Sequence, residues 1–200
     1  MEILTFPLGM IQANCYLCIE SNHVLVIDPG SSSRKIVELI KTNNWHLDAI
    51  LITHGHYDHI GGVDYFADIF KCPIYVSEED EKCFNNPKFN LSNDLVIHNK
   101  YHLYEHAFKL NDFTIEPILA SGHSEGSTLL IINGILFSGD VLFKGSIGRT
   151  DLYGGSDNKM QSSLSIIKSL PSDMLVYPGH GEATTIQNEL QYNPYLISYR

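Results

Sequence analysis

The sequence predicts an α+β fold in a single domain spanning residues 1–200, with helices outside paired sheets. Apolar segments of strand length fall into two groups along the chain, and helical segments follow each group. A length of 200 residues with 44% hydrophobic and 18% charged residues is typical of one globular domain with a substantial core. No linker, repeat or low-complexity run divides the chain.

Apolar runs between turn residues predict strands at residues 3–8, 14–19, 24–27, 48–52, 74–76, 113–119, 127–132, 135–138 and 174–177. Apolar periodicity and capping residues predict helices around residues 36–40, 61–70, 159–170 and 182–190, with a further helix start at 77–80. Ser32 or Ser33 can cap the first helix, and Asn133-Gly134 is a hairpin turn. The segment 85–100 is polar and turn-rich, and its pattern does not indicate which element it forms.

Charge and hydropathy exclude several classes of partner. The net charge of −10 argues against nucleic acid, which is bound through a basic surface. No run of about 18 apolar residues occurs, so we expect no membrane-spanning helix. The first residues lack the basic start and apolar core of a signal peptide, so we expect a cytoplasmic protein that acts on a small molecule.

Cys15 and Cys18 form a C-x-x-C pair within the predicted strand 14–19. Strand side chains at this spacing point to opposite faces, and a redox pair needs a helix N-terminus after the first cysteine. The pattern therefore favours two ordinary thiols over a redox or metal pair. Cys72 and Cys83 lie in no motif, and 4 cysteines in 200 residues are too few for a disulfide scaffold.

Metal-ligating side chains are concentrated just after the predicted strand 48–52, at His54, His56, Asp58 and His59. Burying clustered imidazoles and carboxylates is costly unless they are paired or bind a metal. Strand ends are also where α/β proteins hold their active sites. We therefore expect a metal site here, not merely a polar loop rich in histidine.

Three further polar residues, His123, Asp140 and His180, also follow predicted strands, and each is flanked by glycine. Each alone could be a turn residue, but with the first cluster they supply five imidazoles and two carboxylates. Such ligands suit zinc, and also iron or manganese. Asp28, at the end of strand 24–27, is either a turn former or a carboxylate that supports the metal ligands.

The H-x-H-x-D-H motif followed by a separate His, Asp and His resembles the metallo-β-lactamase superfamily over about residues 6–180. The resemblance implies a four-layer αβ/βα sandwich with two divalent metal ions along one edge of its two sheets. It also implies a ligand set: His54, His56 and His123 for the first metal, Asp58, His59 and His180 for the second, and Asp140 as the bridge between them.

Within that superfamily, residues 145–152 resemble the short bacterial glyoxalase II-like hydrolases, which are similar to hydroxyacylglutathione hydrolases. The resemblance implies hydrolysis of a thioester such as S-lactoylglutathione. A hydroxide shared by the metals would attack the thioester carbonyl, and Asp58 would orient it. Only 20 residues follow His180, so we expect no C-terminal helical region that holds glutathione, and weak binding of that carrier.

Arg149 is the candidate substrate-binding residue outside the ligand set. Its guanidinium could bind a substrate carboxylate through two hydrogen bonds, or it could form a structural ion pair with Asp151. The closeness of Asp151 in the sequence favours the ion pair.

Other interpretations of the metal motif stay open. Persulfide dioxygenases are similar, share a G-R-T-D segment and use one iron held by counterparts of His54, His123 and Asp140. A non-catalytic metal-binding module fits less well, because structural zinc sites close with four protein ligands. Segment 148–151 argues against a lactamase, and the absence of a basic surface argues against an RNA-processing nuclease.

His98, His102 and His106 recur at intervals of four and would form one stripe on a helix. A second metal site there would have only Glu105 to complete its ligands, so we expect exposed histidines instead.

Overall fold

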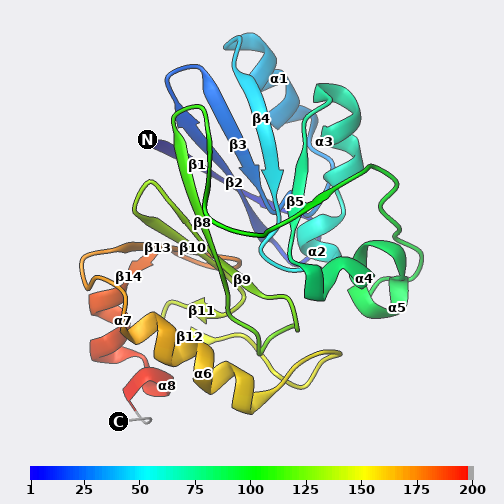
Figure 1. The fold of residues 1–200 in the computed structure, drawn as a ribbon. Coiled ribbons are helices and arrows are strands. Elements are labelled where there is room, and N and C mark those ends of the chain that lie inside the picture. The colour runs from blue at the N-terminus through cyan, green and yellow to red at the C-terminus, as the bar shows by residue number, and fades with distance from the viewer. Residues whose placement is uncertain (198–200) are drawn as a thin grey trace.

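The computed structural model describes residues 1–197 as two six-stranded sheets packed face to face, with helices on both outer faces (Figure 1). The strand order is β1-β2-β3-β4-β5-β6 in the first sheet and β14-β13-β10-β9-β8-β7 in the second. Helix, sheet, sheet and helix form four layers, which confirms the α+β sandwich predicted from the sequence. In this part of the chain, no helix has the length and apolar character to cross a bilayer.

The N-terminal part of the chain builds the first sheet. Its strands are β1 (Glu2–Leu8), β2 (Ala13–Glu20), β3 (His23–Ile27), β4 (His46–Leu51), β5 (Ile74–Val76) and β6 (His102–Leu103). Its helices are α1 (Arg34–Thr42), α2 (Tyr57–Ile60), α3 (Val63–Phe70), the 3-10 helix η1 (Glu78–Asp80), α4 (Glu81–Asn85) and α5 (Pro87–Asn90). β1 to β3 are antiparallel, whereas β3 to β6 run parallel.

The C-terminal part builds the second sheet. Its strands are β7 (Phe108–Leu110), β8 (Phe113–Leu119), β9 (Thr128–Ile132), β10 (Ile135–Gly139), β13 (Leu175–Pro178) and β14 (Thr184–Thr185). A short ribbon of β11 (Leu142–Phe143) and β12 (Ser146–Ile147) stands beside it, with helices α6 (Asp157–Lys168), α7 (Ile186–Tyr192) and α8 (Pro194–Ile197). The predicted helix 182–190 begins later, at Ile186, because Thr184 and Thr185 pair with β13.

The predicted helix at 61–70 is also different in the structure, because a helix break falls at Gly61 and Gly62. The chain there packs against the loop after β3, where Gly62 N donates to Pro29 O at 2.7 Å. A Cβ on Gly61 would lie 2.5 Å from Gly30 O. The result is a separate helix α2, so Asp58 lies in a helix and not in a turn.

Three apolar layers separate the sheets and helices, one between the two sheets and one beneath the helices on each side. Cys15 packs toward the helices and Cys18 toward the second sheet, and neither forms a disulfide. Burial raises the pKa of both thiols, which keeps them protonated and unreactive. The prediction of two ordinary thiols on opposite faces is confirmed.

The three regularly spaced histidines do not form a stripe. His98, His102 and His106 are exposed, and His102 lies on β6. Among residues 1–197, no group of three potential metal ligands includes them. The prediction of exposed histidines is therefore confirmed.

Candidate metal centre

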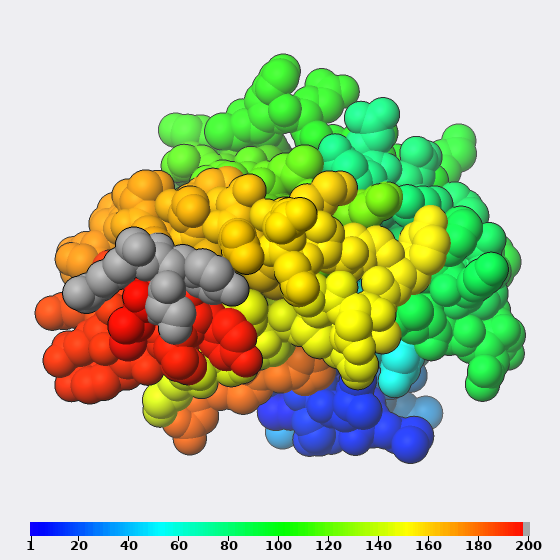
Figure 2. All heavy atoms as spheres, turned by 90° about the horizontal axis from the view of Figure 1, so that it is seen from below, coloured from blue at the N-terminus to red at the C-terminus, as the bar shows by residue number. Residues whose placement is uncertain are grey.

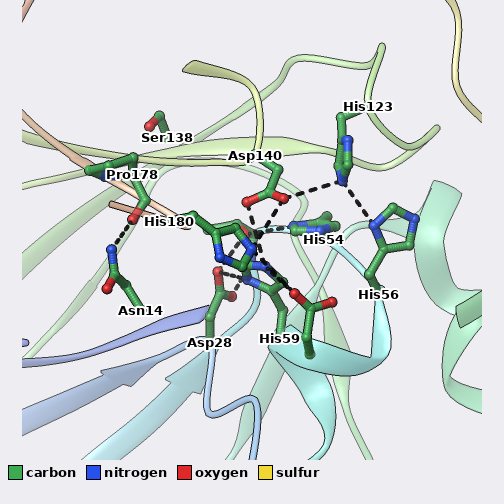
Figure 3. Close-up of polar contacts among 12 residues, drawn as sticks. Asn14, Asp28, His54, His56, His59, His123, Ser138, Asp140, Pro178 and His180 are labelled. Atoms are coloured by element: carbon green, nitrogen blue, oxygen red, sulfur yellow. Dashed lines mark hydrogen bonds and ion pairs between the residues drawn. The ribbon is translucent and has the colours of Figure 1, made fainter. Parts of the chain in front are cut away.

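The candidate ligands follow the carboxyl ends of four strands, β4, β8, β10 and β13. These strand ends meet at one edge of the sandwich (Figure 3). β3 runs parallel to β4 in the first sheet, and β10 runs parallel to β13 in the second. A backbone hydrogen bond joins the two sheets here, from Asn14 N to Gly179 O at 2.7 Å, and within the second sheet Gly179 N donates to Gly139 O at 2.8 Å. Loops that follow strands of both sheets therefore face one centre.

His54, His56 and His123 form what we call the three-histidine group, and all three are buried. His123 Nε2 lies 2.9 Å from His56 Nδ1, and the ring centroid of His54 lies 4.7 Å from that of His56 and 4.8 Å from that of His123. Their ligand atoms lie within 4.8 Å of one another, which one ion could contact together.

Asp58, His59 and His180 form the mixed group. Asp58 and His59 come from α2, and His180 follows β13. Asp58 Oδ2 lies 3.4 Å from His59 Nε2 and 3.3 Å from His180 Nε2. One carboxylate and two imidazoles therefore surround a second position beside the first.

Asp140 lies between the two groups. Its Oδ1 is 3.5 Å from His59 Nε2, and its Oδ2 is 3.5 Å from His123 Nε2 and 3.6 Å from His180 Nε2 (Figure 3). Neither oxygen touches these nitrogens closely enough for a good hydrogen bond. A carboxylate with one oxygen toward each group is the arrangement that a bridging ligand needs.

Several polar atoms at this centre are buried and have no hydrogen-bond partner in the described chain: His54 Nε2, His56 Nε2, His59 Nε2 and Asp140 Oδ1. Leaving such atoms unpaired costs about 1–3 kcal/mol each. Cations at the two positions would satisfy the atoms that face the centre. The donor set therefore fits a dinuclear metal site, and the assignment of single residues to each metal stays a prediction.

The sequence left open whether Asp28 is a turn former or a carboxylate that supports the metal ligands, and its hydrogen bonds decide the matter. Its Oδ2 accepts from His59 Nδ1 at 2.8 Å and from Thr53 Oγ1 at 2.6 Å, and its Oδ1 accepts from Thr53 N at 2.8 Å. A proton held on Nδ1 of His59 leaves Nε2 free to bind a metal. Asp28 is thus the supporting carboxylate, although its φ of 49° shows that it also makes the turn.

Asp80 supports the three-histidine group indirectly, through residues that neighbour its imidazoles in the chain. Its buried carboxylate accepts from Gly55 N at 2.8 Å, from Ser124 Oγ at 2.7 Å and from Gly126 N at 2.8 Å. Gly55 stands between His54 and His56, and Ser124 follows His123. Asp80 therefore connects the two loops that hold the three imidazoles. The sequence predicts only a helix start at residues 77–80, and no local pattern there indicates this role of Asp80.

Arg149 contributes through its backbone. Its carbonyl oxygen accepts from His123 Nδ1 at 2.8 Å, which leaves Nε2 of that ring toward the centre. The guanidinium makes two hydrogen bonds with Asp151, from Nε at 2.7 Å and from Nη2 at 2.8 Å. The ion pair that the sequence favours is present, and the side chain is 62% exposed.

The two groups differ in how readily they take up protons. Burial, followed by the neighbouring imidazoles, lowers the pKa of His54, and burial and His123 lower that of His56 to about 3. Burial disfavours the charged form of His59 too, but Asp140, Asp28 and Asp58 together raise its pKa. The hydrogen bond that His180 donates to the Asp58 carboxylate raises the pKa of His180. His54 and His56 are therefore neutral and ready to bind metal, whereas protons compete for the two imidazoles of the mixed group.

Gly179 is required at the centre because the chain passes close to Asp140 and His59. A Cβ at this position would overlap Asp140 Oδ1 and lie 2.8 Å from His59 Cε1. The glycine lets β13 end beside both metal positions.

Residues 8–180 match the family model of the metallo-beta-lactamase superfamily, so the chain belongs to this family of metallohydrolases. Among curated relatives, it is similar to the probable metallo-hydrolase YqgX of Bacillus subtilis (strain 168), with 36% identity over 100% of this chain and 99% of the relative. It is also similar to the hydroxyacylglutathione hydrolase GloC of Haemophilus influenzae, with 33% identity over 99% of each chain.

Solved structures agree with this assignment. The B3 metallo-beta-lactamase BLEG-1 superposes with a TM-score of 0.93 and 35% identity, covering 98% of this chain and 99% of that one. TTHA1623 in a di-iron-bound form superposes with a TM-score of 0.86 and 31% identity, covering 96% of this chain and 100% of that one. The metallo-β-lactamase fold predicted from the sequence is confirmed.

Proposed function

We propose that this metallohydrolase cleaves a small-molecule thioester, as hydroxyacylglutathione hydrolases do. The observation that carries the proposal is Asp140, whose two oxygens face the three-histidine group and the mixed group from between them. Two adjacent ions, when bound, would polarise a carbonyl and lower the pKa of a water toward about 7. Zn²⁺ suits these ligands, and the di-iron form of TTHA1623 supports iron as the other candidate.

Asp58 is the residue that we assign to orienting the attacking water. Burial favours protonation of its carboxyl, but His59 and then His180 outweigh burial and lower its pKa. The side chain thus stays a carboxylate at neutral pH, with Oδ2 directed toward the centre. An ionised oxygen there can accept a hydrogen bond from water, which turns the water oxygen toward the carbonyl carbon of a bound ester.

The leaving group decides between a thioester and an amide. The titratable groups that meet at the centre are ligand candidates or the hydrogen-bond partners of one. A thiol has a pKa of about 8.5, so it leaves as a thiolate without help from an acid. An amine must be protonated, which would require a further donor. This site therefore suits a thioester best.

A cavity of about 460 Å³ lies beside α2. It is lined by Gly30, Tyr57, Gly61 and residues 91–95. Figure 2 shows the cyan part of the chain near α2 at the surface, bounded by the blue N-terminal hairpin, the green region of α4 and α5 and the yellow loop before α6. Because Tyr57 adjoins Asp58, we propose that the acyl or thiol part of the thioester lies against this ring.

A second candidate activity is β-lactam hydrolysis, because BLEG-1 is a B3 metallo-beta-lactamase of 35% identity. The leaving group of a β-lactam is an amide nitrogen, which must be protonated and would require a further donor at the centre. The two activities share the metal centre and differ in the leaving group, so direct assay separates them.

The test is a substrate panel on protein of known metal content. S-lactoylglutathione, a second acyl thioester and a chromogenic cephalosporin are offered to the metal-loaded and the metal-stripped protein. We expect thiol release from the thioesters by the loaded protein only, with little turnover of the cephalosporin. Cephalosporin turnover without thioester cleavage would overturn the proposal. Oxygen consumption with a persulfide, in protein that holds one iron, would assign a dioxygenase instead.

A further inference from the structure

A second cluster of metal-ligating side chains lies at the opposite end of β3 and β4 from the catalytic centre. His23 begins β3, His46 begins β4, and Asp48 follows two positions later. Asp48 Oδ1 lies 2.9 Å from His23 Nδ1 and 2.7 Å from His46 Nδ1. Figure 1 shows these strand starts at the α1 end of the sheet, far from α2.

A β-bulge places the carboxylate in this cluster. Val24 pairs with Leu47 and Leu25 with Ala49, so Asp48 is the extra residue between two register positions. A bulge redirects the side chain of its extra residue. The Asp48 side chain is only 3% exposed, which is unusual for a carboxylate without a cation.

The carboxylate is also held from the second sheet. Asn111, in the turn between β7 and β8, donates Nδ2 to Asp48 Oδ2 at 2.7 Å. This hydrogen bond leaves Oδ1 for the two imidazoles. Burial would raise the pKa of Asp48, but Asn111, His23 and His46 together lower it, so the group is ionised.

We propose that His23, His46 and Asp48 bind one divalent transition-metal ion through two Nδ1 atoms and Oδ1, with water completing the coordination. Two imidazoles and one carboxylate favour Zn²⁺ or Cu²⁺ over Mg²⁺ or Ca²⁺, which take oxygen ligands. Ligands of a tetrahedral zinc stand about 3.3 Å apart, so the two nitrogens need to move only about 0.5 Å from Oδ1. His46 is 71% exposed and free to make that movement.

The ion would join the amino ends of β3 and β4 and, through Asn111, the second sheet. It touches no residue of the catalytic centre, so its effect is on stability and not on hydrolysis. Without an ion, the same distances would arise if the imidazole N–H groups of His23 and His46 both donated hydrogen bonds to the Asp48 carboxylate. Metal uptake distinguishes these two states of the cluster.

The experiment compares wild type with His46→Ala, Asp48→Asn and His106→Ala. His106 is an exposed histidine outside every potential metal group of residues 1–197, so its variant is the matched control. Each protein, with its catalytic centre loaded, is dialysed against micromolar Zn²⁺, and zinc per chain is measured by mass spectrometry. We expect wild type and His106→Ala to hold one ion more per chain than the other two variants.

Two further readouts identify the ligands. Cu²⁺ bound by wild type should show electron paramagnetic resonance couplings to two imidazole nitrogens, and His46→Ala should lose that signal while it hydrolyses the substrate at the wild-type rate. Zn²⁺ should raise the melting temperature of wild type more than that of His46→Ala. Equal zinc content in all four proteins, or loss of the extra ion in His106→Ala as well, would overturn the proposal.

Discussion

Replacing Asp80 by Asn tests whether this carboxylate holds the three-histidine group in place. The change keeps the size of the side chain but turns one acceptor oxygen into an NH₂ donor. If the remaining oxygen serves Gly55 N and Ser124 Oγ, the NH₂ faces Gly126 N, and two donors then oppose each other. A buried N–H without an acceptor costs about 1–3 kcal/mol. We expect Asp80→Asn to lower the free energy of unfolding by about 2 kcal/mol.

The same substitution should weaken metal binding. Loss of a residue that orients metal ligands typically lowers affinity by about 10–100-fold. Because Asp80 connects only the loops of the three-histidine group, the loss should fall on one ion and spare the other. Zinc titration against a competing chelator measures each affinity, and urea unfolding of the metal-free protein measures stability.

Asp94→Asn is the control for Asp80→Asn, since it makes the same chemical change at an exposed carboxylate. Such surface substitutions usually change stability by less than about 0.5 kcal/mol. Wild-type stability together with wild-type zinc affinity in Asp80→Asn would refute the reasoning. A loss of stability with both zinc affinities unchanged would leave Asp80 a folding residue and not a positioning one.

Three further predictions concern pH and Arg149. On acidification the mixed group should release its ion first, because the pKa values of His59 and His180 are raised whereas those of His54 and His56 are lowered. Simultaneous release of both ions, seen by dialysis at stepped pH, would contradict this. Thioester hydrolysis should rise through an apparent pKa near 7 and then level off, and a rate that still climbs tenfold per pH unit above about pH 9 would argue against activated water. Arg149→Ala should slow acidic and neutral thioesters alike, because its guanidinium is occupied by Asp151; a KM raised only for acidic thioesters would assign it to substrate binding.

The sequence could predict the layers and the candidate ligands because both have local signatures. Apolar runs identify the strands, and His54, His123 and His180 each follow such a run beside a glycine. Strands that end at one edge bring these residues together without any knowledge of long-range contacts.

What the sequence could not predict depends on contacts between distant segments. Glu78, Glu79 and Asp80 are adjacent acids, and nothing in the sequence shows that only Asp80 turns inward to Gly126, 46 positions later. The helix break at Gly61 arises from packing against the loop after β3. Likewise, the bulge that directs Asp48 toward His23 becomes visible only once β3 and β4 are paired.

The number of metal ions at the catalytic centre distinguishes a dinuclear site from a mononuclear one. Metal per chain is measured in protein whose cluster of His23, His46 and Asp48 is disrupted by His46→Ala, so that only the catalytic centre contributes. We expect two ions per chain, with both lost or weakened in Asp140→Ala, because that carboxylate faces both groups. One ion per chain, with no second ion taken up on titration, would contradict it.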